Sequence, residues 1–120
     1  MGDLLKKALL ISLLLFPLCL QAQEQNYRVT KCTLIAQHTH TPYQKFVSSE
    51  IGVIRISPGK VWFETKCFDE TLGILNESTS GGTKIIVLNY RLKTVLTIIG
   101  SKAELDVEGQ FKVVFEVQRN

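Results

Sequence analysis

The fold of this chain is decided by the stretch Lys84-Ile-Ile-Val-Leu-Asn-Tyr-Arg-Leu-Lys-Thr-Val-Leu-Thr-Ile-Ile99. Apolar side chains occupy nearly every second position in it, in the series Ile86, Leu88, Tyr90, Leu92, Thr94, Leu96 and Ile98. A period of two with many β-branched residues is typical of strands that bury one face. Fully extended, at about 3.3 Å per residue, the stretch would exceed an ordinary strand. We therefore expect two antiparallel strands with a bend between Tyr90 and Lys93.

The same alternation predicts strands on both sides of this centre. Phe111–Val117 is the clearest of them, because its phenylalanines and alternate valines share one face while Lys112 and Glu116 share the other. Tyr27–Gln37 is the expected first strand, and Phe46 begins a short element after it. Strands at this spacing, separated by polar connections, indicate an antiparallel meander.

A hairpin is predicted around Ser57-Pro-Gly-Lys60. Proline sets the first central φ of a type II turn, and glycine tolerates the positive second one. The flanking segments Glu50–Ile56 and Val61–Lys66 both alternate and are long enough for strands. This turn is the most specific local feature of the sequence.

Two polar stretches are expected to lie outside the sheet. Asp69–Thr83 reads as a long exposed loop, and Gly100–Gly109 reads as a connection with one helical turn at Ser101–Glu104. About six strands remain, which predicts an all-β fold: a small antiparallel meander forming a barrel or a two-layer sandwich. About eight strands are needed before a barrel interior holds one small ligand. We therefore expect an interior filled by side chains, with the inward set Ile54, Ile56, Phe63, Ile86, Leu88, Leu96, Ile98, Phe111, Phe115 and Val117.

The first 22 residues have the pattern of a secretory signal peptide. Lys6 and Lys7 precede an apolar run, Ala8–Leu20, and Ala22 offers a small residue for cleavage. The leader resembles those of Gram-negative envelope proteins. We expect a signal peptide over residues 1–22, a single β domain over 23–120, and a periplasmic or secreted product with no stable membrane span after cleavage; the alternative is an uncleaved N-terminal anchor.

The cysteines predict one disulfide. Cys19 lies in the leader, and the residues before it, 16–18, do not form a lipobox, so lipidation is rejected. Cys32 and Cys67 are left as an even number in a chain sent to an oxidising compartment, where pairing is the simplest outcome. A redox-active pair would show a short Cys-x-x-Cys spacing, which these two lack.

Composition and motifs exclude several classes of function. The net charge of the 120-residue chain is only +3, and no basic stripe with interleaved aromatic residues is present, so we expect no nucleic-acid partner. His38 and His40 would share one side of an extended segment, but zinc sites need three or four ligands, and a surface loop is the favoured interpretation. No phosphate loop, dinucleotide fingerprint or nucleophile elbow occurs, so we expect no cofactor and no metal.

Acidic residues offer the remaining route to catalysis. Paired carboxylates could be drawn from Glu64, Asp69, Glu70 and Glu77, but a glycosidase holds its sugar in a deep cleft that raises the pKa of one acid. A small domain with an apolar core has little room for such a cleft. We therefore favour a protein that is not an enzyme.

Three residues are the candidate partner contacts. Val61 and Phe63 share the parity of Cys67, so Trp62 is expected to point outward, and tryptophan is enriched at binding hot spots. The alternative is that the long loop or the N-terminal segment covers this tryptophan. Asn76 and Ser80 belong to the polar stretch before Gly81, and Asn76-Glu-Ser78 is also a formal glycosylation acceptor.

Three functions are compatible with these observations. We expect a non-catalytic module that binds or inhibits an unknown protein or envelope polymer; small disulfide-tied periplasmic inhibitors of lysozymes and proteases have a similar format. The alternative is a lipocalin-like carrier of a small apolar ligand, which requires an enclosed apolar pocket. A small hydrolase that uses the acidic residues is the third.

Overall fold

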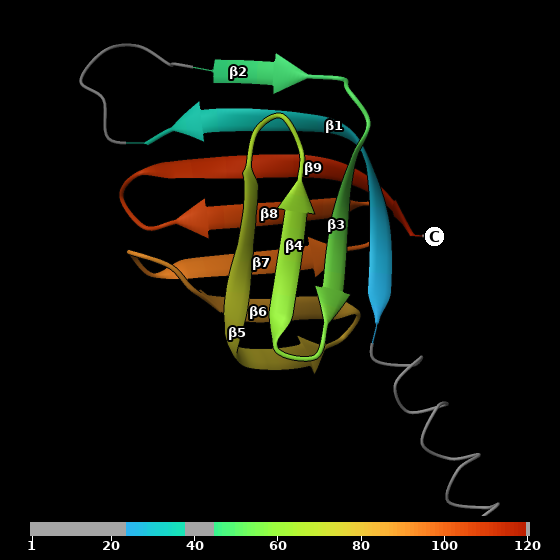
Figure 1. The fold of residues 1–120 in the computed structure, drawn as a ribbon, viewed down its shortest axis with the longest axis vertical. Helices are drawn as coiled ribbons and strands as arrows, with labels where there is room; N and C mark the ends of the chain where they lie inside the picture. The colour runs from blue at the N-terminus through green and yellow to red at the C-terminus, as the bar shows by residue number, and fades with distance from the viewer. Residues whose placement is uncertain (1–23, 38–44, 120) are drawn as a thin grey trace, which may run out of the picture.

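The computed structural model describes residues 24–37 and 45–119, and within them the chain forms nine strands. All neighbouring strands pair antiparallel, which confirms the predicted all-β class. The described residues include no helix that could serve as a membrane span. The strands, labelled in Figure 1, are β1 (Gln25–Ala36), β2 (Lys45–Ser48), β3 (Gly52–Ser57), β4 (Lys60–Glu64), β5 (Asp69–Ser80), β6 (Thr83–Asn89), β7 (Thr94–Ile99), β8 (Lys102–Val107) and β9 (Phe111–Arg119).

The sheet closes on itself because β1 is paired along both of its edges. One edge pairs with β9 between Tyr27 and Ala36. The other edge pairs first with β3, over residues 25–29, and then with β2, over residues 32–35, so β2 and β3 share one place in the order of strands. The result is a closed barrel of eight strand positions (Figure 1). Of the two predicted architectures, the barrel is therefore confirmed and the two-layer sandwich is not.

The stretch 84–99 forms β6, β7 and the turn between them, as predicted. Leu88 lies opposite Thr94, so the inward positions of the two strands are in register. Thr94 is fully buried, and its hydroxyl donates a hydrogen bond to the main-chain carbonyl of Leu92 at 2.9 Å. The buried hydroxyl is therefore hydrogen-bonded, as buried polar groups usually are.

The predicted hairpin is formed by β3 and β4. Ser57 lies opposite Lys60, so Pro58 and Gly59 make a two-residue turn. Gly59 has a φ of 85°, as the second central position of a type II turn requires. The Pro-Gly pair therefore predicted the position of this hairpin correctly.

Two stretches expected to be connections are strands instead, which corrects the count from about six to nine. Residues 102–107, expected to contain a helical turn, form β8, whose Ala103, Leu105 and Val107 are buried and alternate with charged residues. Residues 69–80, expected to be a loop, form β5. The second half of this strand has no alternation of apolar and polar residues to predict it, because its side chains are exposed on both faces from residue 76 onward.

Large side chains from opposite walls meet inside the barrel. Phe63 on β4 and Phe115 on β9 are at most 1% exposed, and their rings stack with centroids 6.1 Å apart. Phe68, in the β4–β5 turn, meets Phe63 edge-on at 5.1 Å and lies 6.1 Å from the ring of Phe111. The predicted inward residues are buried, except that Phe111 is half-buried. Close contact between the walls agrees with the expectation of a filled interior.

A disulfide joins Cys32 in β1 to Cys67 in the β4–β5 turn, as predicted. The two Cα atoms are 6.1 Å apart, and 35 positions separate the residues in the chain. On this edge of β1 the pairing with β3 ends at Val29, and Cys32 is where the pairing with β2 begins, opposite Ser48. The bond thus ties the β4–β5 turn to the wall where the hydrogen-bonded ladder is interrupted.

Replacing Cys32 and Cys67 together with alanine is expected to lower the free energy of unfolding by roughly 3–4 kcal/mol, because the crosslink no longer restricts the unfolded chain. Urea unfolding followed by the fluorescence of Trp62 measures the change. As a control, dithiothreitol should destabilise the native protein by a similar amount and leave the double variant unaffected. Unchanged unfolding midpoints in both experiments would contradict the role of the disulfide.

Gly52, at the start of β3, is required by close packing. A Cβ atom there would lie 2.6 Å from the carbonyl oxygen of Glu64 and 2.9 Å from Cγ2 of Thr65. Glu64 is the last residue of β4 and pairs with Val53, the residue after Gly52, and Thr65 follows Glu64 in the chain. Since a main-chain carbonyl in a paired strand has little freedom to move, any side chain at this position forces the two strands apart.

Gly52→Ala is expected to destabilise the barrel by about 1–3 kcal/mol, the usual cost of overpacking. Gly73→Ala is the matched control, because a Cβ at Gly73 would meet its nearest neighbours at 3.9 Å, an ordinary contact distance. Thermal unfolding of the two variants measures the difference. Equal melting temperatures would show that the close approach at Gly52 costs nothing.

Candidate functional site

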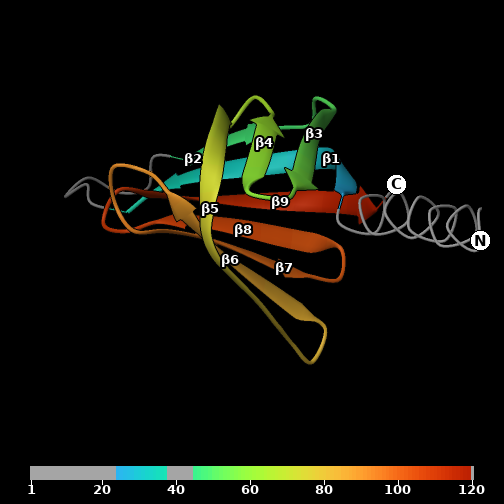
Figure 2. The ribbon, with the colours of Figure 1, turned by 60° about the horizontal axis from the view of Figure 1, so that its bottom comes forward.

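One hairpin extends beyond the wall of the barrel. β5 pairs with β4 only from Asp69 to Gly73, and the ladder ends where the Ile74 N–H donates to the carbonyl of Gly59 at 2.8 Å. A β-bulge follows between Ile74 and Asn76. Beyond it, residues 76–80 pair with 83–87 of β6 through a two-residue turn. We call these two segments and their turn the arm; Figure 2 shows it leading away from the body of the barrel.

The bulge explains why the arm departs from the barrel. An extra residue in one strand bends that strand and increases its local twist. The extra residue here is Leu75, which is 65% exposed. The first half of β5 follows β4, and the second half turns to follow β6, which is the sharp bend seen in Figure 1.

The two faces of the arm differ in chemistry. Side chains alternate across a strand, and the cross-strand pair of Ser78 with Ile85 assigns both to the outer face. On β5 the outer face therefore carries small polar side chains, including the predicted contacts Asn76 and Ser80. The inner face carries Glu77 and Lys84, which point toward the end of the barrel.

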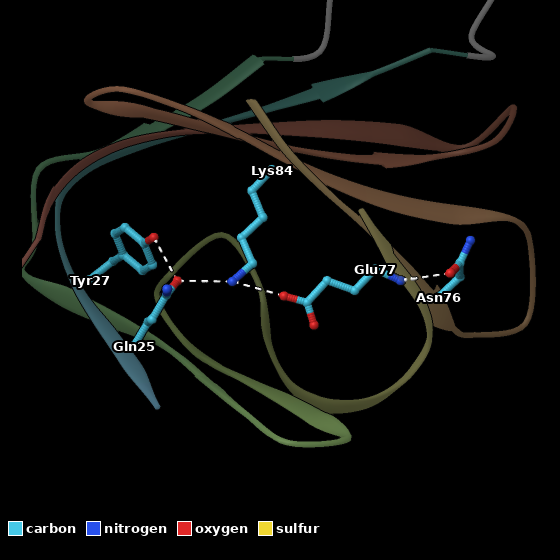
Figure 3. A network of polar contacts seen from close by, with 5 residues as sticks. All are labelled: Gln25, Tyr27, Asn76, Glu77 and Lys84. Carbon is cyan, nitrogen blue, oxygen red and sulfur yellow. Dashed lines mark hydrogen bonds and ion pairs between the residues drawn. The ribbon is translucent and has the colours of Figure 1, made fainter. Parts of the chain in front are cut away.

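Lys84 connects the arm to β1 across the end of the barrel (Figure 3). Its ammonium Nζ lies 2.8 Å from Oε1 of Glu77 and donates to Oε1 of Gln25 at 3.0 Å. The hydroxyl of Tyr27 donates to the same Gln25 oxygen at 3.1 Å. Only 18% of the Lys84 side chain is exposed, whereas 41% of the Glu77 side chain is. One cation thus holds the inner face of the arm to the opposite wall.

The Asn76 side chain binds the main chain of its own strand. Its Oδ1 accepts a hydrogen bond from the N–H of Glu77 at 2.9 Å (Figure 3). Opposite residues of an antiparallel pair either exchange both main-chain hydrogen bonds or neither. Because the Glu77 N–H is bonded to Asn76, the main-chain groups of Glu77 point away from β6. By alternation, those of Thr79 point the same way.

Trp62 lies on the outer face of β4, as its parity predicts, and it is half-buried. Arg55, directly opposite on β3, places its guanidinium carbon 5.1 Å from the centre of the indole ring. Arg55 also lies 3.7 Å from the carboxylate of Glu64. A cation over a tryptophan ring contributes about 0.5–1 kcal/mol at exposed sites. Arg55 therefore contacts the tryptophan ring from β3, while Thr71 of β5 lies beside Trp62 on its other side.

The carboxylates considered for hydrolysis are spread along β4 and β5. Glu64 and Asp69 face each other at one end of the two strands and border an open hollow of about 490 Å³. Glu70 lies beside Tyr90, where burial of the phenol, followed by the charge of Glu70, raises the pKa of Tyr90. Glu77 belongs to the arm. Glu64 and Asp69 are both exposed, whereas a glycosidase acid needs burial to raise its pKa.

The predicted contact residues form two surfaces rather than one. Trp62 lies beside Thr71, on the part of β5 that precedes the bulge, and Asn76 and Ser80 lie beyond the bulge in the arm. Sequence reasoning did not find the Lys84 network. The available clue was position: Lys84 has the same parity as the inward residues of β6, so it had to face the interior or its rim.

The predictions on residues 1–22 and on His38 and His40 fall outside the described residues. Within residues 24–37 and 45–119, no group of three or more histidine, cysteine, aspartate or glutamate side chains is arranged to hold a metal ion. Comparison with protein-family models, with curated proteins and with solved structures finds no match to this chain.

Lys84→Met is expected to loosen the arm while leaving the barrel nearly as stable, because methionine keeps the apolar stem and loses the ammonium that bridges to Gln25. The global cost should be about 1 kcal/mol or less, since Glu77 is well exposed. Amide hydrogen exchange of Ser78 and Ser80, whose N–H groups face β6, should become faster.

Lys112→Met is the matched control for the bridge. Lys112 forms a similar ion pair, 2.7 Å from Glu104, on the barrel wall. Its loss should leave exchange in the arm unchanged. Equal exchange rates in the Lys84→Met variant and the native protein would show that the bridge does not hold the arm.

Proposed function

We propose that this protein is an exported, non-catalytic module that binds or inhibits a protein or an envelope polymer through its outer surface. The observation that carries the proposal is the arm, whose strand from Asn76 to Ser80 stands beyond the barrel wall and exposes its side chains on both faces. A polar hairpin extended into solvent contributes little to the core. Its exposed position makes it accessible to a partner.

The packing of the barrel also favours contact at the surface. Phe63 and Phe115 meet across the interior, and eleven aliphatic side chains of the same core are exposed by no more than 2%. The hollow between β7, β8 and β9, of about 240 Å³, opens on the outside of the barrel. Binding at an outer surface needs no rearrangement of this core.

A lipocalin-like carrier is the second candidate. A closed barrel of eight strands is the smallest that holds one small ligand, which favours this function more than the six strands expected from sequence. An apolar ligand would have to displace rings such as Phe63 and Phe115, at the cost of their stacking and burial. Surface binding is the simpler alternative.

The disulfide supports export. Disulfides persist in oxidising compartments and are rare where glutathione keeps thiols reduced. The bond between Cys32 and Cys67 is therefore compatible with a periplasmic or secreted location and with a cleaved leader at residues 1–22. A small exported domain of this kind meets its partners at the cell envelope or outside the cell.

Affinity capture from the cell envelope, followed by mass spectrometry, tests the proposal. Trp62→Ala should weaken capture at least about tenfold if the tryptophan is a hot spot, and the double variant Asn76→Arg/Ser80→Arg should abolish it by placing large cations on the outer face of the arm. Glu108→Arg, in the turn between β8 and β9, is the control and should bind normally. Capture of no partner by the native protein, or equal capture by all the variants, would reject the proposed function.

A further inference from the structure

We propose that the arm accepts an extended segment of a partner protein as one further strand, added along the edge of β5 from Asn76 to Ser80. This inference rests on the proposed binding function and specifies the chemistry of the partner. Among the described residues, no strand pairs with this edge on the side away from β6, since β4 begins at Lys60, opposite Gly73. We call it the free edge.

The free edge presents main-chain groups in the order that a strand requires. The N–H and C=O groups of Glu77 and Thr79 point away from β6, as the hydrogen bond from the Glu77 N–H to Asn76 indicates. Unpaired groups at alternate residues are the template on which a further strand forms. An extended polypeptide supplies matching donors and acceptors at the same spacing, which is the chemistry of β-augmentation. A polysaccharide has no comparable regular array of alternating amides.

The edge lacks the devices that commonly protect exposed strands. Residues 74–80 contain no proline and no lysine, and the single charge, Glu77, is paired with Lys84. β2 has an unpaired edge as well among the described residues, but it is four residues long and begins with Lys45. Short length and lysine both protect an edge. The arm is therefore the better template.

Charge favours a different protein over a second copy of this chain. If two arms paired antiparallel about Ser78, each Glu77 would lie opposite Thr79 of the other copy, and the two Glu77 side chains would be diagonal neighbours on one face. This pairing would bring a second carboxylate, and no cation, near each Glu77, so it would gain nothing from charge. A foreign strand with lysine or arginine opposite Glu77 would instead meet a carboxylate that is 41% exposed. We therefore commit to a basic, extended segment of another protein.

Asn76 acts as an internal cap on this edge. Its side chain occupies the Glu77 N–H, so an incoming strand must displace the amide before it can pair there. Asn76→Ala removes the competitor and exposes the donor. We expect this variant to bind an added strand about two- to tenfold more tightly, the effect of one net hydrogen bond.

The experiment selects binders from a phage-displayed library of random short peptides, using the oxidised mature protein as bait. Selected peptides are synthesised and then methylated at one main-chain nitrogen at a time. Methylation at every second residue should abolish binding, and methylation at the residues between should be tolerated, because only alternate N–H groups face β5. Enrichment of lysine or arginine at one position is also expected.

Thr79→Pro tests the protein side of the contact. Because the Thr79 N–H points away from β6, proline there keeps the β5–β6 ladder and removes a donor from the free edge. Peptide binding should fall at least about tenfold, the effect of losing one hydrogen bond and admitting a steric clash, while the melting temperature changes little. If this variant does not fold, the tighter binding of Asn76→Ala and the methylation pattern still decide the question.

The possible outcomes separate this inference from the proposed function. Peptides whose binding ignores the parity of methylation, or is unaffected by both Thr79→Pro and Asn76→Ala, overturn strand addition. A dimer of the native protein in sedimentation that Thr79→Pro dissolves overturns the foreign partner in favour of a second copy. Envelope capture that survives in the Thr79→Pro variant overturns the free edge as the site and leaves the binding function standing.

Discussion

Main-chain hydrogen bonding around a closed ring of strands is the constraint on which the rest of this structure depends. A sheet of this size in an open form would have two long edges with unpaired N–H and C=O groups. β1 removes both by pairing with β9 along one side and with β3 and β2 along the other. Once the ring is closed, every inward side chain is forced into one shared interior.

The interior follows from that closure. Side chains from all eight strand positions enter a narrow space, and rings as large as Phe63 and Phe115 reach across it to touch. Gly52 shows how tight the wall is, since even a methyl group there would collide with the carbonyl of Glu64. The disulfide completes the wall at the one point where an edge of β1 changes partner.

The arm extends beyond the closed ring of strands, and the proposed binding function is assigned to it. Past the bulge at Leu75, β5 leaves β4, and β6 is its one partner strand in the part of the chain that the structure describes. Asn76 binds one N–H on the free edge, and Lys84 pairs with the carboxylate of Glu77 on the inner face. A segment that is ordered but lies outside the core is free to vary in chemistry without disturbing the fold.

Local pattern carried much of the prediction. The alternation in residues 84–99 and 111–117 identified β6, β7 and β9, and the Pro58–Gly59 pair located the β3–β4 hairpin. The strand β8 was not predicted, because its charged residues suggested a polar connection. Lys102–Val107 nevertheless alternates between outward charged and buried apolar side chains. The alternation also failed to predict β5. There, Gly81-Gly82 is the signature of a two-residue hairpin turn, but the polar composition of the preceding residues suggested a loop.

The sequence by itself determined the all-β class, the inward residues of the clear strands, and the pairing of Cys32 with Cys67, because these depend on parity and counting. Only the tertiary structure decided that the sheet closes, that residues 76–80 are a strand with a free edge, and that Lys84 bridges to Gln25. Those features require segments far apart in the chain to meet. A period-two pattern says which face a residue takes, but it carries no information about which strand lies beside it.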